Sequence, residues 1–474
     1  MESEGRKAKM NVTRRSFVRA ALAAGAFSHI GCATKGFGRD KVRLACVGIG
    51  QQAWYDIQQF EKTGLVEIAA LCDTDLGGKQ CRPARKRYPN APTFTDFRKM
   101  LDAMEGRIDA VAVMNPDFSH FPALMAAMKR GLAVFSEKPL AHTFEECELL
   151  MAAERKHGVV TQMGNQGHSG DNYWQFKHYV ENGILDVSKL TRLVAHMNMS
   201  RRWHKWNGKV DGFRTGEKLP RGLDWDTWLG TASYHEYSKD YVQGEWRSWY
   251  DFGNGALGDW GAHTMDTMHR FFDLGLPTHV DIENVAGWNA YVFPMQDTLK
   301  FRFAAKGRRP GVTLEWYEGL ANLPELPKGF EYYKRRAAAV PPPGGVKAPE
   351  KQDLLPGKFF TLSDGTSWQG GSHGSAIFRC GGRQNDVPEY PKPGSDHWKN
   401  FILAVMGREE TRSPFSVAAP LCEVFCLGCI AQRLNRGFAF DPASKRIVGD
   451  DEADALLKGS PNTPRKGWEE FYRA

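Results

Sequence analysis

Val42–Val47 (VRLACV) is an apolar, β-branched run, and it ends directly at residues 48–53 (GIGQQA). The run predicts a buried strand, and Trp54–Thr63 continues as a helix. Residues 48–53 fit the pattern G-x-G-x-x-A, in which each small residue has a physical role. Gly48 permits the tight turn, Gly50 lets the backbone approach a pyrophosphate, and Ala53 allows close helix–strand packing. The stretch therefore predicts a dinucleotide-binding βαβ unit.

The next strand indicates which dinucleotide is bound. Val66–Cys72 predicts this strand and ends at Asp73, 25 residues after Gly48. A carboxylate there can accept hydrogen bonds from the adenosine ribose and would repel a 2′-phosphate, which favours NAD over NADP. The nearest arginine, Arg82, stands beyond a Gly-Gly pair. A glycine turn in some other βα unit is the alternative to a nucleotide site.

Strands and helices continue to alternate along the chain. Asp109–Met114 and Ala133–Phe135 predict further strands, with a helix over His120–Arg130 between them. This alternation predicts a parallel, doubly wound α/β sheet, whose ligands bind at the carboxyl ends of the strands. The residues expected at those ends to contact the cofactor are Gly48, Gly50, Gln51, Gln52, Ala53, Asp73, Asn115, Glu137 and Lys138.

Several motifs together resemble the Gfo/Idh/MocA family (glucose–fructose oxidoreductase, inositol dehydrogenase, MocA). They are the glycine turn, Asn115-Pro116 with His120, Glu137-Lys138-Pro139, Gly164-Asn165-Gln166 and residues 255–266 (GALGDWGAHTMD). The resemblance implies a Rossmann domain followed by an α+β domain with a large, mainly antiparallel open sheet that supports homo-oligomers. The same resemblance adds Asn165 and Gln166 to the cofactor-binding set. His120 joins that set too, although packing at a helix start explains it equally well.

The resemblance also implies a catalytic set of Lys138, Asp259 and His263. Lys138 would lie beside the nicotinamide, Asp259 would bind substrate, and His263 would bind substrate and serve as acid/base. Chemistry agrees, because oxidising an alcohol needs a base for the O–H proton and a positive charge near the developing alkoxide. Asp259 and His263 are four residues apart and share a helix face, and Asp266 could orient the imidazole. The alternatives are a surface role for Lys138 and a buried structural role for His263.

Strand-like stretches predict the second domain at Leu190–Met199, His279–Trp288, Thr298–Phe303 and Val312–Trp316. Residues 200–250 are unusually aromatic, and aromatic faces stack well on sugars. We expect Arg247 and Trp249 to lie near a carbohydrate substrate, with Arg201, Arg202 and His204 as further hydroxyl partners. An aromatic core under long loops is the alternative for this segment.

We divide the chain into a leader (1–39), an NAD-binding Rossmann domain (40–160), a substrate domain (161–395) and a C-terminal helical return (396–474). Residues 341–345 (PPPGG) and 369–374 (QGGSHG) mark an insertion of loop character over 319–395, which either caps the site or decorates the surface. Within the return, Ala418–Leu434 predicts a long packing helix.

Charge and cysteine usage exclude several classes of protein. The net charge is +8, but residues 1–39 supply +6 of it, so the body is nearly neutral and gives no reason to expect nucleic acid. Cys422, Cys426 and Cys429 lie in an apolar helical run without partners at zinc-site spacing. They therefore indicate core packing, and no metal is expected.

The first residues resemble a twin-arginine export signal. Thr13–Arg19 (TRRSFVR) precedes Ala20–Ile30, an apolar run too short to span a bilayer. We therefore expect export to the periplasm, with no transmembrane span in the mature chain. Cys32 partly matches a lipoprotein cleavage site, whereas His29 departs from it, so a lipid anchor is left open.

The sequence thus predicts an exported oxidoreductase that moves a hydride between a ring hydroxyl of a sugar or glycoside and tightly held NAD. A cofactor that cannot exchange must be regenerated on the enzyme. One alternative is therefore an NAD-dependent glycoside hydrolase, similar to glycoside hydrolase family 109, that uses transient oxidation, elimination, water addition and re-reduction. An alternative of another class is a non-catalytic carbohydrate-binding protein.

Overall fold

A computed structural model describes residues 38–199, 210–331, 354–383 and 386–473. Residues 1–37 of the leader, with Cys32, lie outside this part of the chain, as do Arg201, Arg202, His204 and the Pro-rich residues 341–345. Residues Arg39–Ala474 form one compact unit.

The first sheet is parallel and six-stranded, in the order β3-β2-β1-β4-β5-β6. Its strands are β1 Val42–Val47, β2 Val66–Cys72, β3 Thr93–Phe94, β4 Ala110–Val113, β5 Ala133–Ser136 and β6 Thr161–Met163. The strand order reverses between β1 and β4, where α/β sheets bind their ligands. The predicted doubly wound α/β fold is confirmed.

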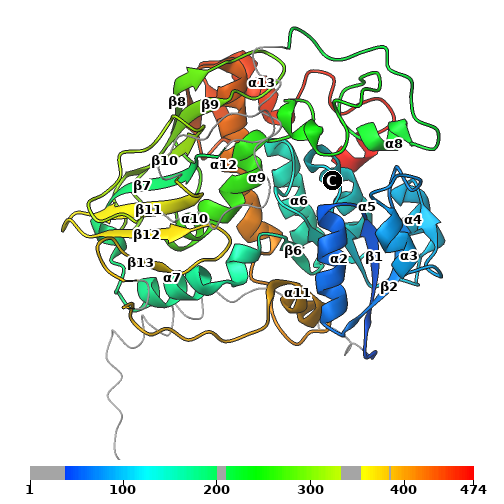
Figure 1. Ribbon diagram of the computed structural model, residues 1–474, viewed down its shortest axis with the longest axis horizontal. Helices are drawn as coiled ribbons and strands as arrows, with labels where there is room; N and C mark the ends of the chain where they lie inside the picture. Colours follow the sequence, from blue (N-terminus) through cyan, green and yellow to red (C-terminus); the bar gives the residue numbers. More distant parts are fainter. Residues whose placement is uncertain (1–37, 200–209, 332–353, 384–385, 474) are drawn as a thin grey trace, which may run out of the picture. The chain divides into compact units, whose positions relative to one another are not determined.

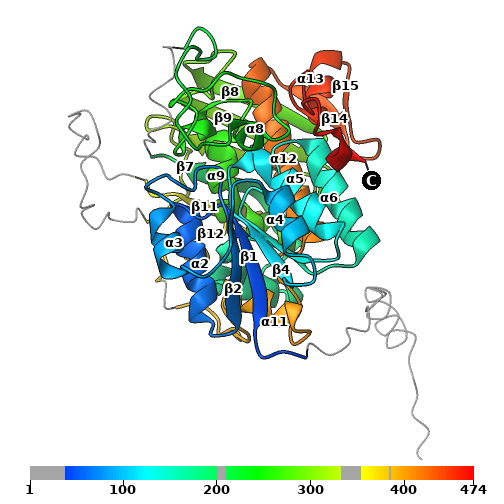
Figure 2. The same cartoon turned by 90° about the vertical axis from the view of Figure 1, so that its right-hand side faces the viewer.

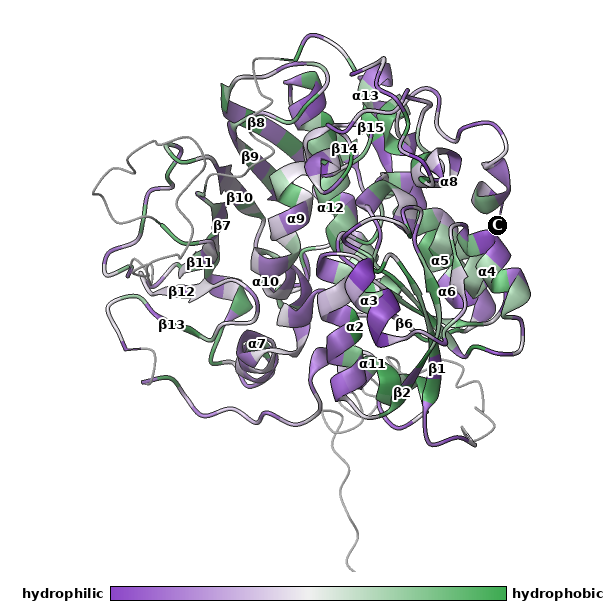
Figure 3. Cartoon of the chain, turned by 45° about the vertical axis from the view of Figure 1, so that its right-hand side comes forward, coloured by the Kyte–Doolittle hydropathy of each residue, from purple (hydrophilic) through white to green (hydrophobic). Residues whose placement is uncertain are grey.

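Helices cover both faces of this sheet, as Figure 2 shows. On one face lie α2 (Gln52–Lys62) and α3 (Arg82–Arg87), and on the other lie α4 (Phe97–Ala103), α5 (His120–Met128) and α6 (Phe144–His157). Every residue of α5 is buried, whereas α2 buries only one side, and Figure 3 shows this difference in hydropathy. A capping box between Thr143 and Glu146 begins α6.

The second sheet has nine strands in the order β13-β12-β11-β7-β10-β9-β8-β14-β15. It is antiparallel except for the pair β7–β10, so the predicted mainly antiparallel sheet is also confirmed. Its strands are β7 Leu190–Met197, β8 His279–Ala286, β9 Gln296–Phe303, β10 Val312–Glu318, β11 Gly357–Leu362, β12 Ser367–Gly371, β13 Ile377–Arg379, β14 Phe438–Asp441 and β15 Arg446–Val448.

Three helices lie between the two sheets (Figure 1): α9 (Gly255–Thr264), α10 (Asp266–Phe271) and α12 (Phe415–Leu434). They join a continuous apolar core that includes residues of both sheets. The helix α12 is long and apolar enough to cross a membrane, but most of it is buried against α6 and α9. It is the long packing helix that the sequence predicts. Cys422 and Cys426 are buried in it, and the described residues hold no group of three potential metal ligands.

The loop character predicted for 319–395 is wrong for residues 357–379. These residues form β11, β12 and β13, and β11 pairs antiparallel with β7 in the interior of the sheet. Phe359 and Phe360 of β11 are fully buried. The C-terminal return also contains the strands β14 and β15, of which β15 lies at the edge of the sheet, beside its helices α11 (His397–Val405), α12 and α13 (Asp451–Ala455).

Candidate active site

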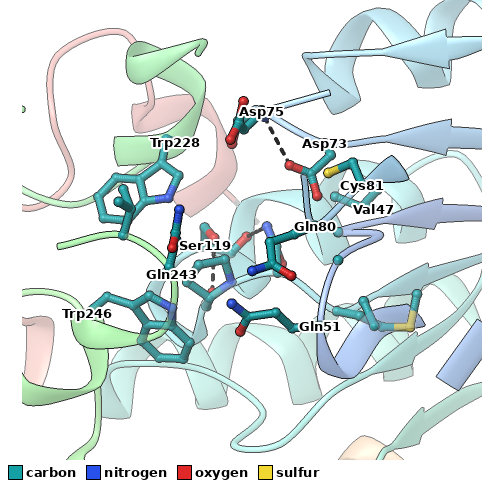
Figure 4. Close-up of a pocket in the computed structure, with 18 of the residues that line it drawn as sticks. Val47, Gln51, Asp73, Asp75, Gln80, Cys81, Ser119, Trp228, Gln243 and Trp246 are labelled. Carbon is teal, nitrogen blue, oxygen red and sulfur yellow. Dashed lines mark hydrogen bonds between the residues drawn. The ribbon is translucent and has the colours of Figure 1, made fainter. Parts of the chain in front are cut away.

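A cavity of about 370 Å³ opens at the carboxyl ends of β1, β2, β4 and β5. Part of its wall comes from the first domain and part from the segment that precedes α9 (Figure 4). It brings together ten of the predicted site residues: Gly48, Gly50, Gln51, Gln52, Ala53, Asp73, Asn115, Glu137, Lys138 and Arg247.

The glycine turn has no room for side chains. Gly48 has a φ of +81°, and a Cβ there would lie 2.7 Å from the backbone nitrogen of Asn115 and from the carbonyl oxygen of Met114. A Cβ on Gly50 would lie 2.9 Å from that of Gln80. These close approaches form a cradle of backbone at the start of α2, where free N–H groups favour a phosphate.

Asp73 is fixed against this turn. One carboxylate oxygen accepts a hydrogen bond from Ile49 N at 3.1 Å, and the other accepts one from Asp75 N at 3.0 Å. Asp75 lines the cavity too, and burial, followed by the nearby Asp73, raises the pKa of its carboxyl. Two acidic side chains at this end suit a ribose with free hydroxyls and oppose a 2′-phosphate.

The other end of the cavity offers acceptors for a carboxamide. Asn115 Oδ1 and Glu137 Oε1 are buried and have no hydrogen-bond partner among the described residues. Burial raises the pKa of Glu137 to about 7, although the Lys138 ammonium opposes the shift. The amide of a nicotinamide can donate to such acceptors. The glycine cradle, the acidic pair and these acceptors fit NAD.

The second domain closes the cavity from the opposite side, with Trp228, Gln243 and Trp246 facing Gln51 and Gln80 (Figure 4). Asp224 N donates to Thr74 O at 2.9 Å, which ties this segment to the end of β2. The Trp228 ring stacks on Trp225, with ring centroids 4.4 Å apart and planes at 12°. The cavity is thus walled on two sides.

Lys138 and Asp259 form an ion pair beside this cavity. Lys138 Nζ donates to Asp259 Oδ1 at 2.7 Å and to the Asp259 backbone oxygen at 3.1 Å. Arg247 Nε lies 3.4 Å from the same carboxylate oxygen. The Lys138 side chain is 11% exposed and that of Asp259 is 15% exposed, and Lys138 lines the cavity whereas Asp259 lies behind it. The surface role considered for Lys138 is wrong.

His263 lies one turn after Asp259 on α9 and is 4% exposed. Its Nδ1 has no hydrogen-bond partner among the described residues. Burial lowers its pKa well below the usual 6.5, and the Lys138 ammonium and His373 lower it further. The imidazole is therefore neutral at neutral pH and carries a lone pair that can accept a proton.

Asp266 does not orient His263, contrary to the prediction. Its carboxylate binds His168 Nδ1 at 3.3 Å and Thr267 N at 2.7 Å, and it lies 3.8 Å from the buried Lys358 ammonium. Asp266 lies on α10, beyond the break between that helix and α9, so the spacing of a continuous helix does not apply.

Trp249 was expected near the substrate, and this prediction is wrong. It is fully buried in an aromatic cluster, where its Nε1 donates to Asp240 O at 3.1 Å. The tryptophans that line the cavity are Trp228 and Trp246 instead. Loops carry no periodicity that separates core from lining residues, so sequence reasoning could not choose among these rings.

Three predicted cofactor contacts do not line the cavity. His120 is fully buried, and its two ring nitrogens lie 2.9 Å from Pro139 O and 2.8 Å from Asn115 O. It thereby joins two cavity loops, which is the helix-start packing that the sequence left open. Asn165 is buried with its Nδ2 3.4 Å from His168 Nδ1, and Gln166 begins the short helix η2 (Gln166–Ser169).

The chain is similar to a known oxidoreductase family over both domains. Residues 42–165 match its NAD-binding Rossmann fold, and residues 170–293 match its C-terminal alpha/beta domain, both of the Gfo/Idh/MocA family. An inositol 2-dehydrogenase/D-chiro-inositol 3-dehydrogenase from Lactiplantibacillus plantarum is 27% identical over 145 residues, 30% of this chain and 41% of that protein. A glycosyl hydrolase family 109 protein from Shewanella sp. is 30% identical over 134 residues, 27% of this chain and 29% of that protein. The chain thus spans less than half of these relatives.

Solved structures share the fold over both domains. The WlbA dehydrogenase from Bordetella pertussis, in complex with NADH and UDP-GlcNAcA, is 14% identical with a TM-score of 0.56 and covers 85% of this chain and 99% of its own. An aldose-aldose oxidoreductase from Caulobacter crescentus, complexed with glycerol, is 15% identical with a TM-score of 0.53 and covers 84% of this chain and 100% of its own.

Proposed function

Because the chain belongs to the Gfo/Idh/MocA oxidoreductase family, with an NAD-binding Rossmann domain, we propose that it oxidises a ring hydroxyl of a sugar or glycoside. One observation carries the proposal. Lys138, paired with Asp259 at 2.7 Å, borders the same cavity as the glycine cradle, and a neutral His263 follows one helical turn later. These side chains supply an ammonium, a carboxylate and a proton acceptor next to Lys138, at the end of the cavity where we expect the nicotinamide.

Each side chain has a role in removing a proton from an alcohol. The Lys138 ammonium holds the reacting oxygen and stabilises the negative charge that develops there. Asp259 fixes Lys138 through its side chain and its backbone oxygen, and Arg247 shares that carboxylate. His263 accepts the hydroxyl proton, because its buried ring is neutral. Bound NAD supplies the acceptor for the hydride that leaves the same carbon.

The first test is the cofactor content of the purified protein. We expect NAD to remain bound, and a keto-sugar to form from at least one member of a panel of sugars and arylglycosides. Lys138→Met should keep the cofactor and lose turnover. A protein that binds carbohydrates but carries no NAD would instead support the non-catalytic carbohydrate-binding alternative.

A second candidate function is cleavage of a glycoside by transient oxidation. The two-sided wall of the cofactor cavity favours it, because walls on both sides would slow the release of NAD and so favour its regeneration in place. Partial similarity to a glycosyl hydrolase family 109 protein supports it as well. Oxidation acidifies the neighbouring C–H, elimination releases the aglycone, water adds to the double bond, and the hydride returns to the ketone. Release of aglycone without net keto-sugar would favour this function over net oxidation.

We also propose that the protein is exported through its twin-arginine leader and acts in the periplasm as a homo-oligomer. The basis for export is the leader sequence, and the basis for the oligomer is the resemblance to the family. Cell fractionation of the wild type and an Arg14→Lys, Arg15→Lys variant tests export, and labelling with a radioactive fatty acid tests whether Cys32 is lipidated. Sedimentation of the mature protein tests the oligomer.

A further inference from the structure

Residues 372–376 (SHGSA) connect β12 to β13, and this connection reaches His263. The His373 ring stacks on the His263 ring with centroids 3.8 Å apart and planes at 21°. His373 N also donates to His263 O at 3.3 Å. This connection, within the predicted insertion over 319–395, therefore places a second imidazole beside His263.

The backbone of this connection is built to hold His373 in place. Gly374 packs against η2 so closely that a Cβ on it would lie 3.0 Å from Gly170 Cα, and its carbonyl oxygen accepts from Asn172 N at 3.1 Å. Ser372 Oγ lies 2.8 Å from His373 Nδ1, which sets the direction of the ring. Both backbone and ring are thus fixed against neighbours.

His373 adopts a conformation that a glycine would adopt at lower cost. Its φ is +56°, in the left-handed region that residues with a Cβ rarely occupy. Strained positions of this kind persist where the surrounding structure holds them, and they gather at functional sites. The neighbours Gly371 and Gly374 show that glycine is used freely in this connection. Position 373 carries an imidazole instead, and that ring lies over His263.

The exposure of the two rings differs. His373 is exposed to solvent, whereas His263 beneath it is 4% exposed. We propose that His373 is a positioning residue for His263: its ring covers the His263 imidazole, excludes water from it and keeps it in the neutral, proton-accepting form. This inference rests on the proposed function for its biological meaning, but the arrangement of the two rings can be tested without a substrate.

The charged groups that face His263 come from four elements. Lys138 follows β5, Asp259 lies on α9, Lys358 lies on β11, and His373 is in the β12–β13 connection. Asp259 favours the protonated imidazole, whereas burial, Lys138, His373 and Lys358 disfavour it, and burial has the largest effect on the pKa. Removing the His373 ring should therefore raise the pKa of His263 mainly by admitting water to its imidazole.

The experiment follows the His263 ring directly, by NMR of the full chain labelled at histidine carbons, with His263→Asn used to assign the signal. At pH 6.5 an ordinary histidine is about half protonated. We expect His263 to be neutral at this pH in the wild type and in His373→Phe, which keeps a ring over it. In His373→Gly, which suits the positive φ, the protonated share at pH 6.5 should rise measurably above that of the wild type, because water reaches the ring while Lys138 and Lys358 still oppose its protonation.

The matched control is Ser375→Ala, in the same connection, because the Ser375 side chain donates to the backbone oxygen of Ser372 at 2.8 Å. The control should titrate like the wild type, and all variants should keep bound NAD. A His263 that stays neutral at pH 6.5 in His373→Gly would overturn the inference. If the His263 signal responds as expected but no carbohydrate is oxidised, the proposed function alone fails.

Discussion

The glycine cradle permits a sharp test through a pair of glycines that differ in one respect. Gly48 has a φ of +81° and Gly64 a φ of +72°, so alanine is strained at both. An alanine Cβ at 48 meets the backbone of Met114 and Asn115 at 2.7 Å, whereas a Cβ at 64 has nothing within 4 Å. The two substitutions separate backbone strain from the loss of the cradle.

The magnitudes follow from these contacts. Left-handed backbone costs alanine about 1–2 kcal/mol at either site. Forcing atoms into packed backbone adds about 1–3 kcal/mol, so Gly48→Ala should lose about 2–5 kcal/mol in all. The clash pushes on Met114 and Asn115, which follow β4, and Asn115 lines the cavity. We therefore expect Gly48→Ala to bind NAD at least about tenfold more weakly, which is 1.4 kcal/mol.

The assay compares NAD retained through purification and the thermal midpoint of unfolding for the wild type and both variants. Gly64→Ala should keep its NAD and unfold at a slightly lower midpoint temperature than the wild type. Gly48→Ala should lose NAD and have a lower midpoint than Gly64→Ala. Equal NAD content and equal midpoints for the two variants would refute the cradle as a cofactor site.

Four further tests address other parts of the site, and one of them uses Trp249→Phe as a control. Lys138→Met should lower kcat by about 10²- to 10³-fold with NAD retained, because the positive charge that stabilises the developing alkoxide is removed; an unchanged kcat would exclude Lys138 from catalysis. Trp228→Ala should speed NAD release in a dilution assay, whereas Trp249→Phe should not, since Trp249 is fully buried outside the cavity; equal release rates would contradict the two-sided wall. Asp73→Ser should raise NADP affinity relative to NAD in competition titrations, because a charge that repels the 2′-phosphate is removed. Burial lowers the pKa of His120 to about 4 from 6.5, so its contribution to stability is complete above pH 6.5 and is lost as the pH falls to about 4. Urea unfolding should show that the free energy of unfolding falls less between pH 7 and pH 5 in His120→Gln than in the wild type. An equal fall in both proteins would contradict a buried, neutral His120.

Local pattern was sufficient for the first domain. The strands β1 and β2 match their predicted bounds, because buried parallel strands are continuous apolar runs and the glycine turn marks where the first one ends. The family resemblance singled out Lys138, Asp259 and His263, and the structure pairs Lys138 with Asp259 and places His263 one turn later on α9, while their catalytic roles stay a prediction.

Long-range pairing was not predictable in the same way. The strand β11 lies beside β7, more than 150 residues earlier in the chain, and no local signal marks that neighbour. A hairpin signal did exist, because Asp364-Gly365 separates Phe359–Leu362 from Ser367–Gly371, but the glycines of residues 369–374 suggested a loop. His373 was missed with them.

The account depends on hydride transfer from a carbon bearing a hydroxyl to bound NAD beside Lys138 and His263. The most direct measurement is mass spectrometry of the bound cofactor after incubation with sugars and arylglycosides deuterated at their ring carbons. We predict that deuterium appears in the cofactor of the wild type and is lost in His263→Asn, whether the overall reaction is oxidation or glycoside cleavage. A cofactor that stays bound and gains no deuterium from any of these substrates would contradict the account.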